Sequence, residues 1–430
     1  MPGTFRSLKI YNYRLWAGGA LISNVGTWMQ RTAQDWLVFT QLTHHNATAV
    51  GMVIGFQFGP QFLLLPWTGY AADHFNRRRL LIATQGGMAL LSLALGMLDV
   101  TGLVQLWHVY VFAFLFGCVT AIDAPARQTF VSELVGDADL SNAVALNSTS
   151  FNVARMVGPA VSGVLISGVG SGWAFLINAA SFCAVLGSLG FLRRGELHQG
   201  KRAGRSPGSF AEGFRYVWKR ADLKAIFFML FLIGAFGFNF PIFISAMSVS
   251  AFHGDASQYG LLMSIMAIGT VAGALLAARR ENPGFLVLLP ASAIFGAGSA
   301  LASLMPNYAL FGLALVIIGI STQTITTSTN SLVQLSTEPV MRGRVLAILI
   351  AIALGSSPVG APFVGWISDR FGPRWALAVG AASGFAAAAV ALHYLMKHRK
   401  LRISFRTGRL RFSIGEGLQE PVPALGTGLE

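Results

Sequence analysis

The chain is poor in charged residues, which make up 11% of its 430 residues. A soluble protein of this length carries about a quarter. Cysteine is also scarce, and the two present, Cys118 and Cys183, exclude a disulfide framework. No nucleotide-binding run of the G-x-x-x-x-G-K-[ST] type occurs, and no hydrolytic triad or metal-ligand spacing stands out. We therefore expect a chain that is not an enzyme and that holds no cofactor and no metal.

Apolar residues dominate the chain. Hydrophobic residues make up 54% of it, and its mean hydropathy is +0.60. They gather in twelve runs near the length of about 20 residues that a membrane-spanning helix needs. The runs are too long and too uniformly apolar for the strands of a membrane barrel. We therefore expect an all-α polytopic membrane protein with twelve transmembrane helices in two six-helix bundles. The runs cover residues 15–40, 48–71, 80–99, 105–126, 144–167, 173–192, 223–247, 257–278, 284–304, 308–334, 345–367 and 373–396.

The polar segments divide the chain into four parts. Residues 1–193 form the N-terminal bundle, 194–222 a cytoplasmic linker, 223–396 the C-terminal bundle and 397–430 a basic cytoplasmic tail. Within the linker, Phe210 to Trp218 could form a short helix on the membrane surface. The tail alternates apolar and polar residues, which fits a short hairpin, but an isolated hairpin is marginal in stability. We therefore expect the tail to be disordered.

The placement of the basic residues predicts the orientation. The net charge of +14 might indicate nucleic-acid binding, but the basic residues lie in short clusters between the apolar runs. With a cytoplasmic N-terminus, all but four of the 31 lysines and arginines fall on the cytoplasmic side. The four are Arg31 and Arg155 within spans, and Arg370 and Arg374 on the opposite side. This bias predicts that both termini are cytoplasmic, and we expect no binding to nucleic acid.

An internal repeat relates the two halves. The stretch from Gly163 to Ser181 matches the stretch from Gly365 to Ser383, and the offset is 202 residues throughout. It places the junction of spans 5 and 6 on the junction of spans 11 and 12. Together with the central linker, this repeat indicates two related bundles.

The loop after span 2 carries the most specific motif. Gly69 is followed four residues later by Asp73 and then by Arg77 and Arg78. This resembles the loop 2–3 signature of the major facilitator superfamily, whose fold relates its two bundles by a pseudo-two-fold axis. The resemblance implies that the loop latches the bundles together on the cytoplasmic side, with the start of span 11 as partner. Asn76 departs from the pattern, since many members have Gly there. The alternative is a basic loop with an incidental Asp.

Spans 4 and 5 narrow the resemblance. The run Asp123-Ala-Pro-Ala-Arg127 and the later run from Arg155 to Pro159 look like the branch that contains bacterial siderophore exporters and drug-efflux proteins. Asp123 and Arg127 lie one helical turn apart and can pair. We expect a small charge network near Asp73, as part of the cytoplasmic gate. A stabilising ion pair without a role in gating is the alternative.

Span 5 carries a second motif, made of Gly158, Pro159, Ser162 and Gly163. It is similar to the Gly-Pro motif of facilitator antiporters, with Ser162 in place of one Gly. That resemblance implies a segment that seals against proton leak and marks export. Ordinary packing of small residues between helices is the alternative.

Charged residues within the spans are candidates for proton coupling. Asn24, Trp28, Arg31 and Asp35 share one helical face of span 1. Because a charge in lipid is costly, this face should line a central cavity. Arg31 and Asp35 can neutralise each other, so that protonation of Asp35 would release Arg31. Arg155 in span 5 could bind an anionic or hydroxyl-rich substrate or pair with Asp35. Alternatively, Asp35 is solvated at the outer mouth and Arg155 is structural.

Polar side chains in other spans are candidates for the substrate path. Some of them could instead form hydrogen bonds between helices. The candidates are Asn24, Gln57, Gln61, Asn239, Gln323 and Asn330.

These features predict a secondary transporter of the bacterial inner membrane. Without a nucleotide site, energy must come from an ion gradient or from the gradient of the substrate. We interpret the chain as a monomeric exporter of an amphipathic small molecule, such as a siderophore, drug or secondary metabolite, by proton antiport and alternating access. Its partners would be this substrate, protons and membrane lipids. The alternatives are an uptake or lipid-flipping facilitator and a membrane sensor or scaffold that transports nothing.

Overall fold

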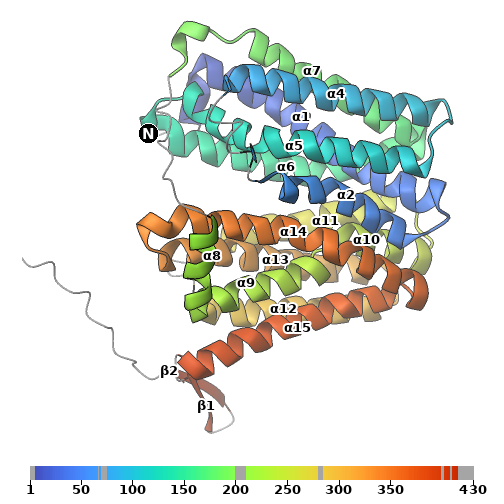
Figure 1. Cartoon of the computed structure of the whole chain (residues 1–430). Helices are drawn as coiled ribbons and strands as arrows, with labels where there is room; N and C mark the ends of the chain where they lie inside the picture. The colour runs from blue at the N-terminus through green and yellow to red at the C-terminus, as the bar shows by residue number, and fades with distance from the viewer. Residues whose placement is uncertain are drawn as a thin grey trace, which may run out of the picture.

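The computed structural model is almost entirely helical and consists of two stacked helical bundles (Figure 1). The N-terminal bundle comprises α1 (Tyr11–Trp36), α2 (Ala47–Leu63), α4 (Arg77–Val100), α5 (Leu106–Leu134), α6 (Asp137–Val169) and α7 (Ser171–Gly190). The C-terminal bundle comprises α9 (Ala221–Phe236), α10 (Phe240–Ser245), α11 (Ala256–Ala278), α12 (Phe285–Leu304), α13 (Tyr308–Ser336), α14 (Pro339–Phe371) and α15 (Pro373–His398). The structure describes residues 5–65, 67–68, 75–198, 210–278, 284–398, 401–406 and 409–414.

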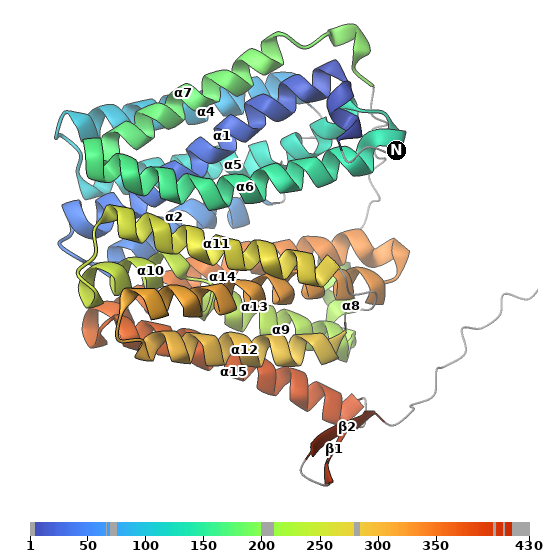
Figure 2. The same cartoon turned by 180° about the vertical axis from the view of Figure 1, so that it is seen from behind.

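Twelve segments run along the bundles, as the sequence predicts. Within the described residues, ten are long and apolar enough to cross a membrane, the segment Ala221–Ala251 counting as one of them. The other two, α1 and α2, lie alongside them in the N-terminal bundle (Figures 1 and 2). Polar residues lower the hydropathy of α1, and α2 has 17 residues. The predicted fold class is therefore confirmed.

The structure repeats in its two halves with the offset found in the sequence. α5 begins at Leu106 and α13 at Tyr308, α6 at Asp137 and α14 at Pro339, and α7 at Ser171 and α15 at Pro373, so each pair is 202 residues apart. The turn that ends α6 is Gly170, with φ 97°, and its counterpart after α14 is Gly372, with φ 100°. Both positions need the left-handed backbone that glycine adopts without strain.

A second pair of features also occurs once in each half. π-helical turns follow the first span of each bundle, at η2 (Leu37–Leu42) and η4 (Ala246–Ala251). Each is followed by a histidine with positive φ, at His44 and His253. Because π-helical turns are rare, their occurrence at matching places supports the relation between the bundles.

Span 7 is broken, whereas the sequence predicts one continuous helix over 223–247. α9 ends at Phe236 and α10 begins at Phe240. Pro241 stands in the first turn of α10, and its ring and missing N–H prevent α9 from continuing through it. Asn239 in the break donates a hydrogen bond to the carbonyl of Ala235 at 2.6 Å. The break places Asn239 beside the space between the bundles.

The segments outside the bundles lie mostly at one end. There the short helices η1 (Arg6–Lys9) and η3 (Arg194–Glu196), the linker helix α8 (Phe210–Lys219) and the end of α15 lie together (Figure 1). We call this end the linker face and the other end the opposite face. α8 occupies the predicted range, and its Glu212 forms an ion pair with Arg344 of α14 at 2.9 Å.

The tail differs from the expected disorder over part of its length. Strands β1 (Leu401–Arg406) and β2 (Arg409–Ile414) pair antiparallel, from Leu401 with Ile414 to Arg406 with Arg409. The apolar and polar alternation around Thr407-Gly408 suits a two-residue hairpin turn. The hairpin is the other form that the alternating pattern allows, and residues 415–430 lie outside the described residues.

The two bundles meet along two helix pairs, α2 with α14 and α6 with α11; Figure 2 shows α6 and α11 side by side. Glycines set both crossings. A side chain on Gly260 would lie 2.3 Å from the carbonyl oxygen of Pro159, and one on Gly51 would lie 2.4 Å from that of Ala361. The backbones therefore touch directly, as small residues permit.

Candidate transport site

A cavity of about 220 Å³ lies between the bundles. Both bundles contribute to its wall, through α1, α2 and α6 on one side and the α9–α10 break, α11 and α14 on the other. Its polar side chains come mainly from α1, and its apolar ones include Phe238, Phe240, Met263 and Met266. It combines a polar wall with an apolar one, as expected of a site for an amphipathic ligand.

Two arginines share one aromatic ring in this cavity. The guanidinium carbons of Arg31 and Arg155 lie 5.1 Å and 5.5 Å from the Trp28 ring centroid, within cation–π range. The Nε of Arg31 is buried and has no hydrogen-bond partner within the described residues. Neither arginine forms an ion pair with a described acidic residue. The cavity therefore offers two cationic donors that are free to bind a ligand.

Asp35 is the acidic residue of the cavity wall. Its side chain is buried, with 7% exposed, and it accepts a long hydrogen bond from the hydroxyl of Tyr259 in the other bundle at 3.4 Å. No nitrogen of Arg31 lies within 4.0 Å of its oxygens, so the two side chains interact through their charges at longer range and not as a direct ion pair. Asp35 therefore lies between the bundles at depth, away from a solvated mouth.

The predicted polar path is only partly found in the cavity. Gln57 and Asn239 line it. Gln61, Gln323 and Asn330 do not. They donate instead within their own helices, to the carbonyl of Gln57, the hydroxyl of Thr327 and the carbonyl of Thr326. Such local bonds satisfy polar groups inside a membrane, where water is absent. Asn24 also lies outside the cavity wall.

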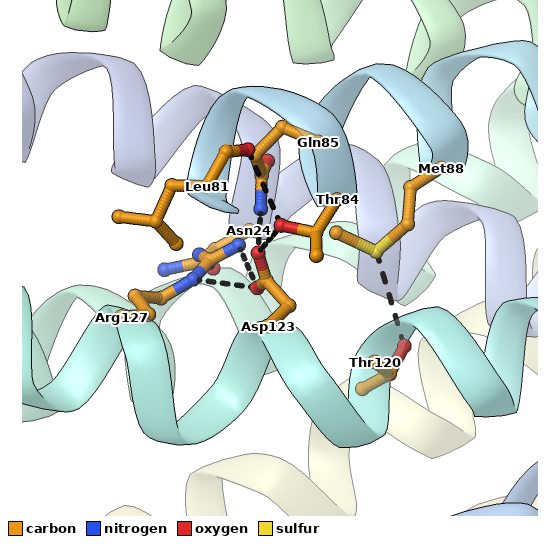
Figure 3. A network of polar contacts seen from close by, with 8 residues as sticks. All are labelled: Asn24, Leu81, Thr84, Gln85, Met88, Thr120, Asp123 and Arg127. Atoms are coloured by element: carbon orange, nitrogen blue, oxygen red, sulfur yellow. Dashed lines mark hydrogen bonds and ion pairs between the residues drawn. The ribbon is translucent and has the colours of Figure 1, made fainter. Parts of the chain in front are cut away.

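Asn24 instead joins a polar network of α1, α4 and α5 (Figure 3). Arg127 donates to Asp123 at 3.0 Å and to the side-chain oxygen of Asn24 at 3.1 Å. Thr84 and Gln85 each donate to the other oxygen of Asp123 at 2.7 Å. Every acceptor position of the buried carboxylate is used, so the predicted pair of Asp123 and Arg127 ties three helices together.

The loop signature is described only in part, because Gly69 and Asp73 lie outside the described residues. Its arginines have partners within the N-terminal bundle. Arg77 forms an ion pair with Glu133 at 2.7 Å, and Arg78 donates to the carbonyl of Leu189 at 2.7 Å. Asn76, where many members of the superfamily have Gly, has a structural role in this chain. Its side chain caps α4 by accepting from the N–H of Arg79 at 3.1 Å.

The span 5 motif presents two different faces. Gly158 and Ser162 face α1: a side chain on Gly158 would meet Trp28, and the Ser162 hydroxyl donates to the carbonyl of Met29 at 2.9 Å. Pro159 and Gly163 face α11 in the other bundle, where Gly260 packs against both. The four small residues therefore join α6 to its own bundle and to the other one at the same depth.

Polar contacts between the bundles gather toward the opposite face. Besides Tyr259 and Asp35, the hydroxyls of Ser167 and Ser257 lie 2.9 Å apart. Asp369, at the end of α14, accepts from the N–H groups of Ala47 and Thr48 at the start of α2. The sequence reasoning missed Asp369, although it lies in the stretch used for the repeat.

Most of the chain matches one protein family. The model of the family described as "Transmembrane secretion effector" matches residues 3–405. The chain belongs to this family. This secretion-effector chain is 25% identical over 360 residues to the staphyloferrin A transporter of Staphylococcus aureus (81% of this chain, 87% of the relative). It is 26% identical to the multidrug efflux pump Tap of Mycolicibacterium fortuitum (82% and 88%) and 25% identical to the enterobactin exporter of Shigella flexneri (80% and 82%).

Solved structures show the same fold at low identity. A POT family transporter in complex with 5-aminolevulinic acid superposes with a TM-score of 0.74 at 11% identity, covering 90% of this chain and 96% of that one. A bacterial homologue of the lysosomal transporter Spinster, in an inward-facing conformation, gives a TM-score of 0.65 at 16% identity, covering 89% and 95%. The secretion-effector chain is therefore a multi-pass transporter of the major facilitator type, and the predicted resemblance is confirmed.

Proposed function

We propose that this transporter exports an amphipathic small molecule by proton antiport through alternating access. The observation that carries the proposal is the cavity between the bundles, which brings Asp35 together with Arg31 and Arg155. Charged residues inside a membrane protein are costly and are kept where they bind ions or substrate. All the cavity walls come from one chain, so a monomer suffices.

The substrate class follows from the walls and from the relatives. Aromatic and thioether side chains offer apolar contact, while the two arginines donate hydrogen bonds and Asp35 accepts them. An oxygen-rich molecule with an apolar part satisfies all three. Siderophores and many drugs have this character, and the names of the relatives include two siderophore transporters and a multidrug pump.

Coupling would depend on competition at Asp35. A hydroxyl of the substrate donates to the ionised carboxylate, and protonation neutralises that carboxylate and makes it a weaker acceptor. A proton that enters from outside therefore displaces the substrate there and resets the site. The substrate favours the ionised form of Asp35, and the proton converts it to the neutral form. Each of them shifts the two-state equilibrium only as far as its affinities for the two states differ.

The linker face is proposed to be cytoplasmic, by the distribution of basic residues. The glycine crossing of α6 with α11 closes the opposite side. Toward the linker face, Val144, Ser148 and Phe151 follow on the helix face of Arg155 and are exposed. A closed crossing at the opposite face and exposed residues toward the linker face fit a state that is open to the cytoplasm. In this state a substrate made inside the cell can bind.

Accumulation in cells tests the proposal. Cells with and without the protein are loaded with staphyloferrin A, enterobactin and a lipophilic dye, with and without a proton uncoupler. We expect lower accumulation of at least one compound in cells with the protein, and loss of that difference with the uncoupler. A difference that persists with the uncoupler contradicts proton coupling. Higher accumulation supports uptake, and no difference for any compound supports a sensor or scaffold.

A further inference from the structure

The loop signature has a second copy at the end of α14. Residues 365–374, Gly-Trp-Ile-Ser-Asp-Arg-Phe-Gly-Pro-Arg, match residues 69–78, Gly-Tyr-Ala-Ala-Asp-His-Phe-Asn-Arg-Arg, in register. Gly, Asp, Phe and the final Arg are identical. An aromatic residue follows the Gly in both, and a basic or imidazole residue follows the Asp. One copy follows α2 in the sequence, with Gly69 and Asp73 outside the described residues, and the other ends α14 at the opposite face.

The described copy makes a contact between the bundles. The carboxylate of Asp369 accepts the N–H of Ala47 at 2.7 Å with one oxygen and the N–H of Thr48 at 2.8 Å with the other. The hydroxyl of Thr48 also donates to it. Asn46 caps the N–H of Ala49 at 2.9 Å from within the N-terminal bundle. The first turn of α2 therefore has three N–H groups satisfied, two of them by the C-terminal bundle.

Gly365 makes this approach possible. It lies one turn before Asp369, and a side chain there would meet the carbonyl oxygen of Ala47 at 2.5 Å and the Cα of Thr48 at 2.7 Å. The Gly and the Asp four residues later thus have linked roles: one lets the backbones touch, and the other binds the helix N-terminus, where the dipole favours a negative charge. The spacing of the motif is explained by this geometry.

We propose that Asp369 and the N-terminus of α2 form a latch that closes the opposite face and must break when that face opens. This inference rests on the proposed alternating access and adds to it a residue that sets the balance between its two states. In the sequence, one copy of the motif follows α2 and the other ends α14, and these two helices cross at the interface between the bundles. In folds built from inverted repeats, equivalent devices are expected at both membrane faces.

The latch holds through a charge near solvent. Asp369 is exposed, so its attraction to the helix end is screened by salt and is modest in strength. A modest contact suits a transporter, because the state that it favours must be left in every cycle. Loss of the carboxylate is expected to shift the ratio of the two states about tenfold toward the open opposite face.

Distance measurements on the full chain test the latch. Spin labels are placed at Thr101 and Pro306, exposed positions at the opposite face in different bundles, after both native cysteines are replaced. The test variant is Asp369→Asn, which removes one acceptor and the charge. The control is Asp255→Asn at the same face, because Asp255 caps its own helix by accepting from Gln258 at 2.8 Å. No substrate and no proton gradient are needed.

We expect two distance populations in the parent, and about a tenfold larger ratio of long to short distances in Asp369→Asn alone. The ratio should also rise with salt in the parent and not in Asp369→Asn. An unchanged ratio in a folded Asp369→Asn protein, with two populations present, overturns the latch and leaves the proposed function intact. A single population in the parent and in both variants contradicts alternating access and the latch together.

Discussion

Asp35 differs in its partners from two other acids in the helices of the N-terminal bundle, the buried Asp123 and the half-buried Asp99. Asp123 is bound by Arg127, Thr84 and Gln85, and Asp99 accepts from the hydroxyl of Ser171 at 2.6 Å. Asp35 has one long hydrogen bond to Tyr259, across the interface between the bundles. A carboxylate that is weakly bound and faces a cavity can change its protonation with little effect on the packing around it.

Replacement of Asp35 therefore separates coupling from folding. Asp35→Asn keeps the shape but is neutral and cannot take up a proton, so we expect substrate affinity to fall and to lose its dependence on pH, and proton-driven transport to fall at least about tenfold. The measurement is transport in proteoliposomes with an imposed pH gradient. The matched control is Asp99→Asn, which removes a half-buried acid outside the cavity wall. Equal losses in both variants would argue against a special role for Asp35.

Arg127 and Arg155 are expected to differ in how much they contribute to the stability of the protein. Arg127→Met leaves the buried carboxylate of Asp123 without its cation, which costs about 3 kcal/mol of stability. Arg155→Met removes a cation that has no ion-pair partner among the described residues, so stability should change by no more than about 1 kcal/mol, the size of its cation–π contact with Trp28. Thermal unfolding in detergent measures both. Substrate affinity should fall in Arg155→Met, and a similar destabilisation of the two variants would show that Arg155 is structural.

Closure of the bundles at the opposite face depends on the crossing of helices α6 and α11. Gly260 touches the backbone of Pro159 and Gly163 directly. The span 5 motif therefore packs between bundles as well as within one, and both the antiporter-like interpretation and ordinary packing of small residues agree with this arrangement.

A methyl group at this crossing should hold the helices apart. We expect Gly260→Ala to destabilise the closed opposite face by about 1–3 kcal/mol, as overpacking does. A thiol reagent that does not cross the membrane should then label a cysteine at Ser357, in the cavity wall, faster from the opposite face. Gly187→Ala in α7 is the control, because a side chain there meets nothing within 4 Å. Unchanged labelling in Gly260→Ala would contradict closure at this crossing.

The elements were predictable to different degrees. Runs of about 20 apolar residues predict spans because lipid requires every backbone group to be bonded within a helix. The break at Asn239 was missed because the residues around it are apolar on both sides. Gln323 and Asn330 do not line the cavity, and their hydrogen bonds within α13 could not be predicted because the sequence shows only a polar stripe. The contact of Asp369 with α2 depends on how the bundles dock, which a single sequence does not contain.

At the scale of the whole molecule, the offset of 202 residues holds for three consecutive helices in each half. The helix boundaries repeat even where residues at matching positions in the two halves differ. The reason is that the thickness of the membrane constrains the length of each helix and the position of the turns. The repeat also explains why most of the basic residues lie near one face. Each bundle has six spans, an even number, so the linker and both chain ends return to the same face.

Orientation is testable by protease access. With the linker face in the cytoplasm, a protease added outside should cleave a tag on the C-terminus in inside-out vesicles and spare it in right-side-out vesicles. The physical reason is the excess of basic residues near the linker face. A second tag at the N-terminus should behave in the same way. Cleavage of one tag in each vesicle type would contradict an even number of spans.

Transport into inside-out vesicles tests the central claim most directly. Vesicles containing the protein are energised to acidify their interior and supplied with the compound that shows export in cells. The account predicts accumulation inside these vesicles, its loss with an uncoupler and its loss in Asp35→Asn. Accumulation that occurs only in right-side-out vesicles, or that survives both the uncoupler and Asp35→Asn, would contradict proton-coupled export.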